Sequence, residues 1–468
     1  MEYSNQKGQW GSRFGFLMAA IGSAVGLGNL WGFPYKMGNN GGFAFLVVYL
    51  ALVIFVGVVV MLAELALGRK SGKGVIAAYE TLGRKYKIIG WFGWISPVLI
   101  LGFYCMLGGY CIKYAIANIG DLFNASWGVA GADSAEFFAG FTANQVESTI
   151  YTLIFVALTM IIVQAGVSGG IEKFTTFAMP ALFVMLLIVI IRSVTLPGAD
   201  AGLEFIFKPN FEVFKGTGWI NVLASAGGQM FFSLSLGMGI MVTYGSYMKK
   251  EEDLQQNSLI IPLADTTVAV MASLAIMPAV FSAGQDPAQG PGLLFITLQT
   301  VFQAMGSLGP LFGFLFYVLV FIAAITSSIS LTEAVSSAIM DRHIEKGKPI
   351  NRRKIITMVG IFVALEGTFV ALDGLGANGF PQIFGQSTWL DSFDLVSEGI
   401  LMPLGAMIMA IVFGWIKPVY LDDEITYGGR EYKMKKYFHY SIKFIAPPIL
   451  LLVLLGQIDT FFKLGWFS

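Results

Sequence analysis

Two glycine-rich clusters lie inside long apolar segments of the sequence, at residues 22–34 (GSAVGLGNLWGFP) and 227–239 (GGQMFFSLSLGMG). Closely spaced glycines disfavour an unbroken helix, and the first cluster also ends in a proline. Backbone N–H and C=O groups freed at membrane depth must find polar partners, and oxygen atoms of this kind suit hard cations. We therefore expect broken helices that bind ions and a polar solute. The alternative is close helix packing through small residues.

The composition is typical of a polytopic α-helical membrane protein. The chain has 468 residues, of which 56% are hydrophobic and 12% charged. Its apolar runs are mostly long enough to cross a bilayer as helices of about 20 residues, whereas a β-barrel would show short alternating segments. The formal net charge of zero gives no basic field that would attract nucleic acid. The sequence therefore predicts an all-α protein of the lipid bilayer.

Cysteine and histidine usage argues against a disulfide and against an enzyme. Cys105 and Cys111 lie six residues apart in one apolar segment and would point to different faces of a helix, so we expect free thiols. His343 and His439 fall in expected cytoplasmic loops. No span contains a combination of residues that would form a metal site or an activated nucleophile, so we expect no enzyme activity.

Hydropathy predicts eleven membrane crossings. They lie near residues 14–34, 43–67, 88–118, 148–165, 174–194, 219–245, 259–281, 308–340, 355–373, 394–416 and 442–466. With a cytoplasmic N-terminus, Lys and Arg fall mostly on the cytoplasmic side. The positive-inside rule therefore predicts a cytoplasmic N-terminus and an extracellular or periplasmic C-terminus.

The two glycine clusters occupy corresponding positions in two halves of the sequence. The first lies in span one and the second in span six, which enters the membrane from the opposite side. Interrupted spans in matching positions of inverted halves point to a secondary transporter with its site at the midplane. We expect one transporter domain over residues 1–468, with a first repeat at about 10–195, a second at about 215–416 and an extra helix at about 440–466.

Asp265 is the most discriminating single residue because it is ionisable and falls in the seventh span. A charge within the bilayer is costly and by default marks a functional site, so Asp265 needs a cation or a proton. The alternative is that Asp265 lies in water near the cytoplasmic end of its span.

The clusters, together with Thr326-Ser327-Ser328 in the eighth span, resemble the motifs of the neurotransmitter:sodium symporters. The prokaryotic amino-acid transporters of this family define the LeuT fold. The resemblance covers nearly the whole chain, from Trp10 through the tenth span. It implies an all-α polytopic LeuT fold with five-plus-five inverted repeats and an eleventh helix, in a prokaryotic plasma (inner) membrane.

The resemblance also implies two sodium sites. The ligands of the first would be the Ala24 carbonyl, the side chains of Asn29, Ser233 and Asp265, and the substrate carboxylate. The ligands of the second would be the carbonyls of Gly22, Val25 and Ala323 and the hydroxyls of Thr326 and Ser327. From the residues alone, these two hydroxyls are equally expected to bond back to the preceding helical turn.

In many relatives an asparagine stands at the position of Asp265, and chloride or a nearby glutamate supplies the negative charge. Here Tyr49, Gln229 and Ser233 match the halide-coordinating pattern, but Ala269 stands at the position of the last ligand. We therefore expect Asp265 to supply the charge directly and transport to be independent of chloride.

The resemblance predicts an α-amino acid as substrate, because Gly26 stands where relatives that carry amines have an aspartate. The carboxylate would be held by the Leu27 and Gly28 amides and the Tyr104 hydroxyl, although an isolated tyrosine is more often an ordinary buried residue. The ammonium would face carbonyls and hydroxyls. The expected substrate-binding residues are Ala24, Gly26, Leu27, Gly28, Ile100, Tyr104, Phe232, Ser233, Ser235, Met238, Ser327 and Leu331.

The expected contacts to the substrate side chain are apolar, with Phe232 as a lid, so a hydrophobic or aromatic amino acid is predicted. Met238 adds a flexible thioether that adapts to varied shapes. The alternatives are a sodium-coupled transporter of another small zwitterion, such as a β- or γ-amino acid, and a transporter-like amino-acid sensor. The sequence does not determine the oligomeric state.

The expected mechanism is alternating access between two gates. Residues that match the inner gate of relatives are Lys7, Trp10, Tyr247 and Asp341. At the outer gate Asp394 matches the acidic partner, but Gly32 replaces the usual arginine. Either Lys36, one turn further along the helix, reaches Asp394 in its place, or Lys36 is a solvated loop residue.

Overall fold

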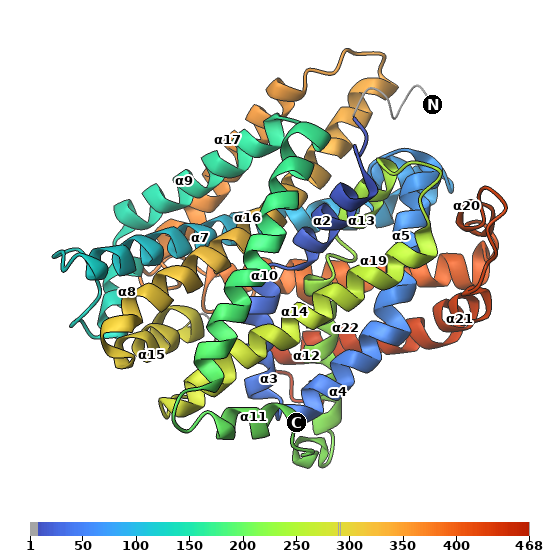
Figure 1. Ribbon diagram of the computed structural model, residues 1–468. Helices are drawn as coiled ribbons and strands as arrows, with labels where there is room; N and C mark the ends of the chain where they lie inside the picture. The colour runs from blue at the N-terminus through green and yellow to red at the C-terminus, as the bar shows by residue number, and fades with distance from the viewer. Residues whose placement is uncertain (1–7, 289, 291, 468) are drawn as a thin grey trace.

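The computed structural model describes residues 8–288, 290 and 292–467, and Figure 1 shows their arrangement. The expected gate residue Lys7 lies outside these residues. Within them the chain is helical and contains no strand. Nine continuous helices of the described part are long and apolar enough to cross a membrane, and the bent pair Arg13–Ala24 and Gly28–Asn39 makes a tenth candidate span. The sixth expected crossing consists of two shorter helices in the structure.

The continuous spans agree with the windows expected from hydropathy. Their bounds are Phe43–Ser71, Arg84–Leu122, Gln145–Gln164, Val167–Val194, Leu254–Ser282, Gly306–Glu345, Arg352–Asp373, Trp389–Ile416 and Lys435–Phe462. The α-helices of these spans that matter below are α4 (Phe43–Leu52), α5 (Val58–Ser71), α7 (Lys87–Leu122), α9 (Gln145–Gln164), α10 (Lys173–Val194), α14 (Leu254–Ser282), α16 (Gly309–Glu345), α17 (Arg352–Asp373) and α22 (Ala446–Phe462). Cys105 and Cys111 of α7 are free and buried.

Both glycine clusters break their helices. In span one, α2 (Arg13–Ala24) ends at an extended Val25, a π-helical turn follows at Gly28–Gly32, and α3 (Phe33–Asn39) completes the span; the two parts are bent by 44°. In span six, α12 (Gly218–Ser233) and α13 (Ile240–Ser246) are separated by residues 234–239. Ser235, Gly237 and Gly239 have φ of 54°, 73° and 71° in this gap. Such left-handed conformations are readily adopted by glycine and end the helix.

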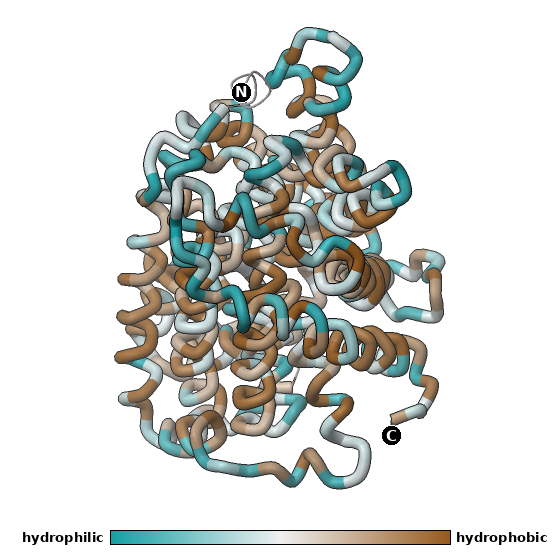
Figure 2. Tube along the Cα trace, turned by 90° about the vertical axis from the view of Figure 1, so that its right-hand side faces the viewer, coloured by the Kyte–Doolittle hydropathy of each residue, from teal (hydrophilic) through white to brown (hydrophobic). Residues whose placement is uncertain are grey.

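Two groups of helices surround the breaks. In the first group α7 packs along α16, and α9 packs along α17 (Figure 1). In the second group α13 packs on α5, and α14 packs on α2 and α5. Figure 2 shows hydrophobic residues concentrated along the helices and hydrophilic residues mainly in the loops. We call the end of the bundle that holds Trp10 and Tyr247 the Trp10 end, and the end that holds Lys36 and Glu398 the vestibule end.

Helix contact between α5 and α13 depends on Gly68. A Cβ atom at this position would lie 2.0 Å from the Val242 carbonyl oxygen, so Gly68→Ala must push the two helices apart. We expect a loss of about 1–3 kcal/mol in the free energy of unfolding, seen as a lower apparent melting temperature of the purified protein. The control is Gly140→Ala, at a helical glycine with nothing within 4 Å, which should leave stability unchanged or raise it. Equal melting of both variants would contradict this account.

Candidate functional site

A small cavity lies between the two helix breaks and the helices α7 and α16. Its lining residues come from spans one, three, six and eight, namely Ser23, Ala24, Gly26, Gly28, Ile100, Tyr104, Phe232, Ser235, Met238, Ile240, Ser327 and Leu331. All the expected substrate-binding residues line it except Leu27 and Ser233. The lining residues that the sequence reasoning missed are Ser23, next to the expected Ala24, and Ile240, the first residue of α13.

The polar wall of the cavity is formed by close contacts between the first break, α7 and α16. The Leu27 amide donates to the Tyr104 hydroxyl oxygen at 3.0 Å, so Leu27 contributes its backbone although it does not line the cavity. A Cβ atom at Gly26 would lie 2.4 Å from Ser327 Oγ and 2.5 Å from the Tyr104 hydroxyl oxygen. Glycine is therefore required at position 26, since a larger residue would fill the space in front of both hydroxyls.

Asp265 of α14 is fully buried behind the cavity. Its Oδ1 accepts from Asn29 Nδ2 at 2.7 Å, its Oδ2 accepts from the Tyr49 hydroxyl at 3.2 Å, and Ser233 Oγ lies 3.0 and 2.9 Å from the two oxygens. The alternative that Asp265 lies in water is therefore wrong. Ser233 belongs to this cluster instead of the cavity lining because it faces α14.

The Asp265 cluster has the chemistry of a site for a small hard cation. The partners of the carboxylate in the described part of the chain are neutral donors, so no protein cation balances its charge there. A buried carboxylate without a counter-charge is costly, whereas a monovalent cation held by oxygen atoms would balance it. Asn29 Oδ1 accepts from the Gly26 amide at 3.0 Å and presents a further oxygen. Ala24, the last residue of α2, directly precedes the first break.

The residues expected at the second sodium site also lie together, where α2 meets α16. Ser327 Oγ lies 3.4 Å from the Gly22 carbonyl oxygen and 3.0 Å from that of Ser23. Thr326 Oγ1 donates within its own helix to the Ile322 and Ala323 carbonyls, both at 3.0 Å. The alternative of back-bonding thus holds for Thr326, and Ser327 instead bridges the two helices. Val25 is buried at the extended end of α2.

The Trp10 end of the pathway is closed by aromatic and polar contacts. The Trp10 indole donates to the Tyr244 carbonyl at 3.1 Å, and its ring packs edge-on against Tyr244 and Tyr247. The other expected gate residue, Asp341, accepts from the Gly74 amide at 2.6 Å.

A buried ion pair that the sequence reasoning missed strengthens this closure. Tyr247 donates to Glu333 Oε1 at 2.7 Å, and the Glu333 carboxylate is held by Arg352 Nη2 at 2.5 Å. Arg352 also donates to the Val163 carbonyl at the end of α9. A signal was present, because Glu333 is an ionisable residue inside the eighth span, as Asp265 is inside the seventh.

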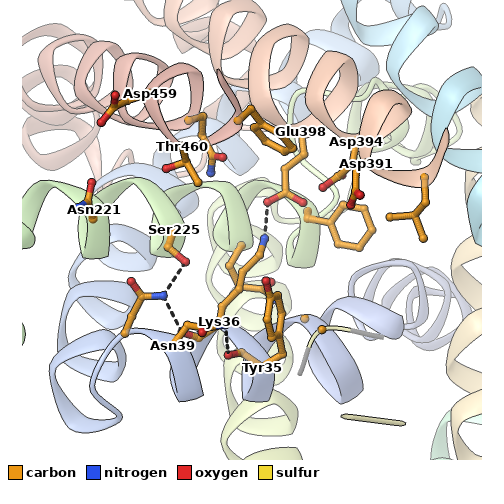
Figure 3. A pocket seen from close by; sticks show the side chains of 18 of the residues that line it. Tyr35, Lys36, Asn39, Asn221, Ser225, Asp391, Asp394, Glu398, Asp459 and Thr460 are labelled. Carbon is orange, nitrogen blue, oxygen red and sulfur yellow. Dashed lines mark hydrogen bonds and ion pairs between the residues drawn. The ribbon is translucent and has the colours of Figure 1, made fainter. Parts of the chain in front are cut away.

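The vestibule end holds a cavity of about 740 Å³, which Figure 3 shows from close by. Phe232 lines both this cavity and the small one, so its ring lies between them. Asp394, the last residue of α18 (Trp389–Asp394), lines the cavity together with Lys36 and Glu398. The Phe232 side chain therefore belongs to the barrier between the small cavity and the vestibule.

Lys36 pairs with Glu398 in the vestibule (Figure 3), and the expectation that it reaches Asp394 is wrong. It lies in helix α3 with only 19% of its side chain exposed, so the alternative of a solvated loop residue is also wrong. The physical reason is that both partners lie one helical turn beyond the positions of the expected pair. Lys36 lies one turn beyond Gly32, and its amine meets the acid one turn beyond Asp394. A Cβ atom at Gly32 would lie 2.8 Å from Gln229 Oε1, an atom that has no partner among the described residues.

Comparisons with known proteins agree with this geometry. Residues 7–131 and 139–467 match the model of the Sodium:neurotransmitter symporter family. An uncharacterized sodium-dependent transporter of Bacillus subtilis, YhdH, is 35% identical over 457 residues, covering 96% of this chain and 97% of its own. An uncharacterized sodium-dependent transporter of Haemophilus influenzae is 33% identical over 465 residues, covering 97% and 99% of the two chains.

A solved structure has the same architecture. The crystal structure of MhsT in complex with L-phenylalanine matches with a TM-score of 0.86 and 36% identity, covering 96% of this chain and 99% of MhsT. The protein is thus a multi-pass membrane protein of the LeuT fold and a sodium-coupled transporter, not an enzyme. The chain belongs to the sodium:neurotransmitter symporter family.

Proposed function

We propose that the protein is a sodium-coupled symporter that imports a hydrophobic or aromatic α-amino acid by alternating access, without a requirement for chloride. The observation that carries this proposal is the small cavity, which combines hydroxyls and broken-helix backbone at one end with Ile100, Met238, Ile240 and Leu331. The complex of MhsT with L-phenylalanine supports the same substrate class.

The polar end of the cavity suits a zwitterion. No residue that lines it carries a formal charge, so an amine without its own carboxylate would bury an unpaired charge there. The carboxylate would accept from the Leu27 and Gly28 amides and from the Tyr104 hydroxyl. It would replace the bond that the Leu27 amide makes to the Tyr104 oxygen in the structure. The ammonium would face the carbonyls of Ala24, Phe232 and Ser233 and the hydroxyl of Ser235.

Two sodium ions would be transported with the substrate. One would lie among Ala24, Asn29, Ser233, Asp265 and the substrate carboxylate, where it balances the charge of Asp265. The other would lie among Gly22, Val25, Ala323, Thr326 and Ser327. Because Asp265 already supplies a negative charge beside the first ion, a chloride ion would add a second, uncompensated one.

Alternating access would use the two closures described above. The Trp10 end would face the cytoplasm of a prokaryotic cell and open inward when the contacts of Trp10 and Tyr247 separate. The vestibule end would face outward and close over Phe232 through Lys36 and Glu398. The single transporter domain would consist of two repeats, at about 10–195 and 215–416, and an extra helix at about 440–466.

A stability screen in detergent tests the substrate class. Each of the twenty amino acids, and a β- and a γ-amino acid, is added in sodium or in potassium. A ligand at about 100 times its dissociation constant adds about 2.7 kcal/mol to the stability of the folded state, so the melting temperature rises. We expect a shift only in sodium and only with apolar or aromatic α-amino acids. Uptake of the same ligand against a gradient in proteoliposomes then separates a transporter from a sensor.

Asp265→Asn tests the origin of the negative charge. Loss of the carboxylate should raise the sodium concentration for half-maximal uptake by at least about tenfold, or about 1.4 kcal/mol. Replacing chloride by gluconate at fixed sodium and osmolarity should leave uptake by the unmodified protein unchanged. Ser273→Ala, which alters a buried hydroxyl of α14 bonded to its own helix, is the control. Unchanged sodium dependence in Asp265→Asn, or a need for chloride in the unmodified protein, would refute the assignment.

The vestibule pair is tested by a double-mutant cycle of Lys36→Gln and Glu398→Gln. Lys36→Gln leaves the buried Glu398 carboxylate without its cation, and Glu398→Gln removes the ion-pair partner of Lys36. Uptake should therefore fall in both, with a coupling free energy of about 0.5–3 kcal/mol. The exchanged pair Lys36→Glu with Glu398→Lys should recover part of the activity. Lys463→Gln, at another vestibule lysine, is the matched control. Additive losses in the cycle would mean that the pair does not form the gate.

A further inference from the structure

Two polar side chains at the vestibule end of α10 have no partner in the described part of the chain. Ser193 is buried, with 1% of its surface exposed, and its hydroxyl makes no hydrogen bond. The adjacent Arg192 has a buried Nε without an acceptor, and its guanidinium takes part in no ion pair among the described residues. Neither residue contributes to the proposed sodium, substrate or gate sites.

Both side chains line one small cavity between α10, α14, α16 and the short helix α15 (Leu298–Ala304), which are labelled in Figure 1. The other lining residues are apolar, including Ala275 and Ala279 of α14 and Phe302 of α15. The cavity is about 10 Å³ in volume, enough for about one oxygen atom. Two residues with unpartnered donors therefore line a space that admits a single acceptor.

The position of Arg192 places this acceptor at the membrane surface. The helical span Val167–Val194 has 28 residues and is longer than the hydrocarbon core, so its last turn lies at the level of the lipid headgroups. In the last turn and a half before Arg192, α10 has exposed apolar side chains, namely Leu187, Ile188 and the adjacent Ile191, which is 64% exposed. A molecule at Arg192 would thus meet a cationic donor beside a lipid-facing surface.

We propose that Arg192 and Ser193 bind the phosphate group of a glycerophospholipid in the leaflet at the vestibule end. One phosphate oxygen enters the cavity and accepts from Arg192 Nε and Ser193 Oγ. A second oxygen accepts from a terminal nitrogen of the guanidinium, because arginine offers a planar fork that matches phosphate. The acyl chains lie along Leu187, Ile188 and Ile191. Free phosphate shares the headgroup chemistry, and the apolar face favours the lipid.

The test compares ligands on delipidated full-length protein in detergent. The probes are dioleoylphosphatidylglycerol, dioleoylglycerol, glycerol phosphate and inorganic phosphate, with binding measured by native mass spectrometry and melting temperature. We expect phosphatidylglycerol to bind and raise the melting temperature, and dioleoylglycerol, which lacks the phosphate, to bind at least tenfold more weakly. Equal effects of inorganic phosphate or glycerol phosphate would overturn the lipid assignment.

Variants test the residues. Arg192→Gln should weaken phosphatidylglycerol binding at least tenfold, Arg192→Lys should weaken it less, and Ser193→Ala should weaken it severalfold. Lys208→Gln removes a positive charge beyond the same end of the protein, where Lys208 pairs with Glu204, and should change nothing. Melting temperatures without lipid report whether each variant is folded. Unchanged lipid binding in both Arg192→Gln and Arg192→Lys would overturn the site and leave an ordered water as the acceptor.

Discussion

The structure depends on satisfying the backbone groups that are freed where spans one and six break. A peptide group without a partner at membrane depth costs several kcal/mol, so each break must be covered by the rest of the protein. The Gly28 carbonyl accepts from Gln229 Nε2 at 2.7 Å, and the Gly237 amide donates to Glu64 Oε1 at 2.8 Å. The Leu27 amide is covered by Tyr104. Each break is thus stabilised from another helix, which fixes the helices around the cavity.

Much of this arrangement could be predicted because its signals are local in sequence. Glycine clusters at matching positions, an ionisable Asp265 within a span and hydroxyls at residues 326 and 327 are visible without a structure. The pairing of charges between helices could not be predicted in the same way. Whether Lys36 meets Asp394 or Glu398 depends on the axial offset of two helices that are distant in sequence, and one turn of offset changes the partner.

Glu333 is a buried acid whose partner could not be identified from the sequence. The rule that singled out Asp265 applies to it equally, since both are ionisable residues inside apolar spans. Its partner Arg352 begins the next helix, and only the packing of α16, α17 and the end of α9 brings them together. The Glu333 carboxylate also helps to close the Trp10 end, because Tyr247, directly after α13, donates a hydrogen bond to it.

The Asp265 cluster explains how coupling could follow from the arrangement. Its carboxylate has only neutral donors in the described structure, and its nearest polar neighbours, Asn29 and Ser233, lie in the two broken spans. A cation bound there would hold both broken spans against α14, which carries Asp265. The proposed ligands of the same cation include the carbonyl of Ala24, a residue that lines the small cavity, so the cation would favour a ligand whose carboxylate completes its coordination. Ion and zwitterion would then stabilise one another, which is the coupling free energy that symport requires.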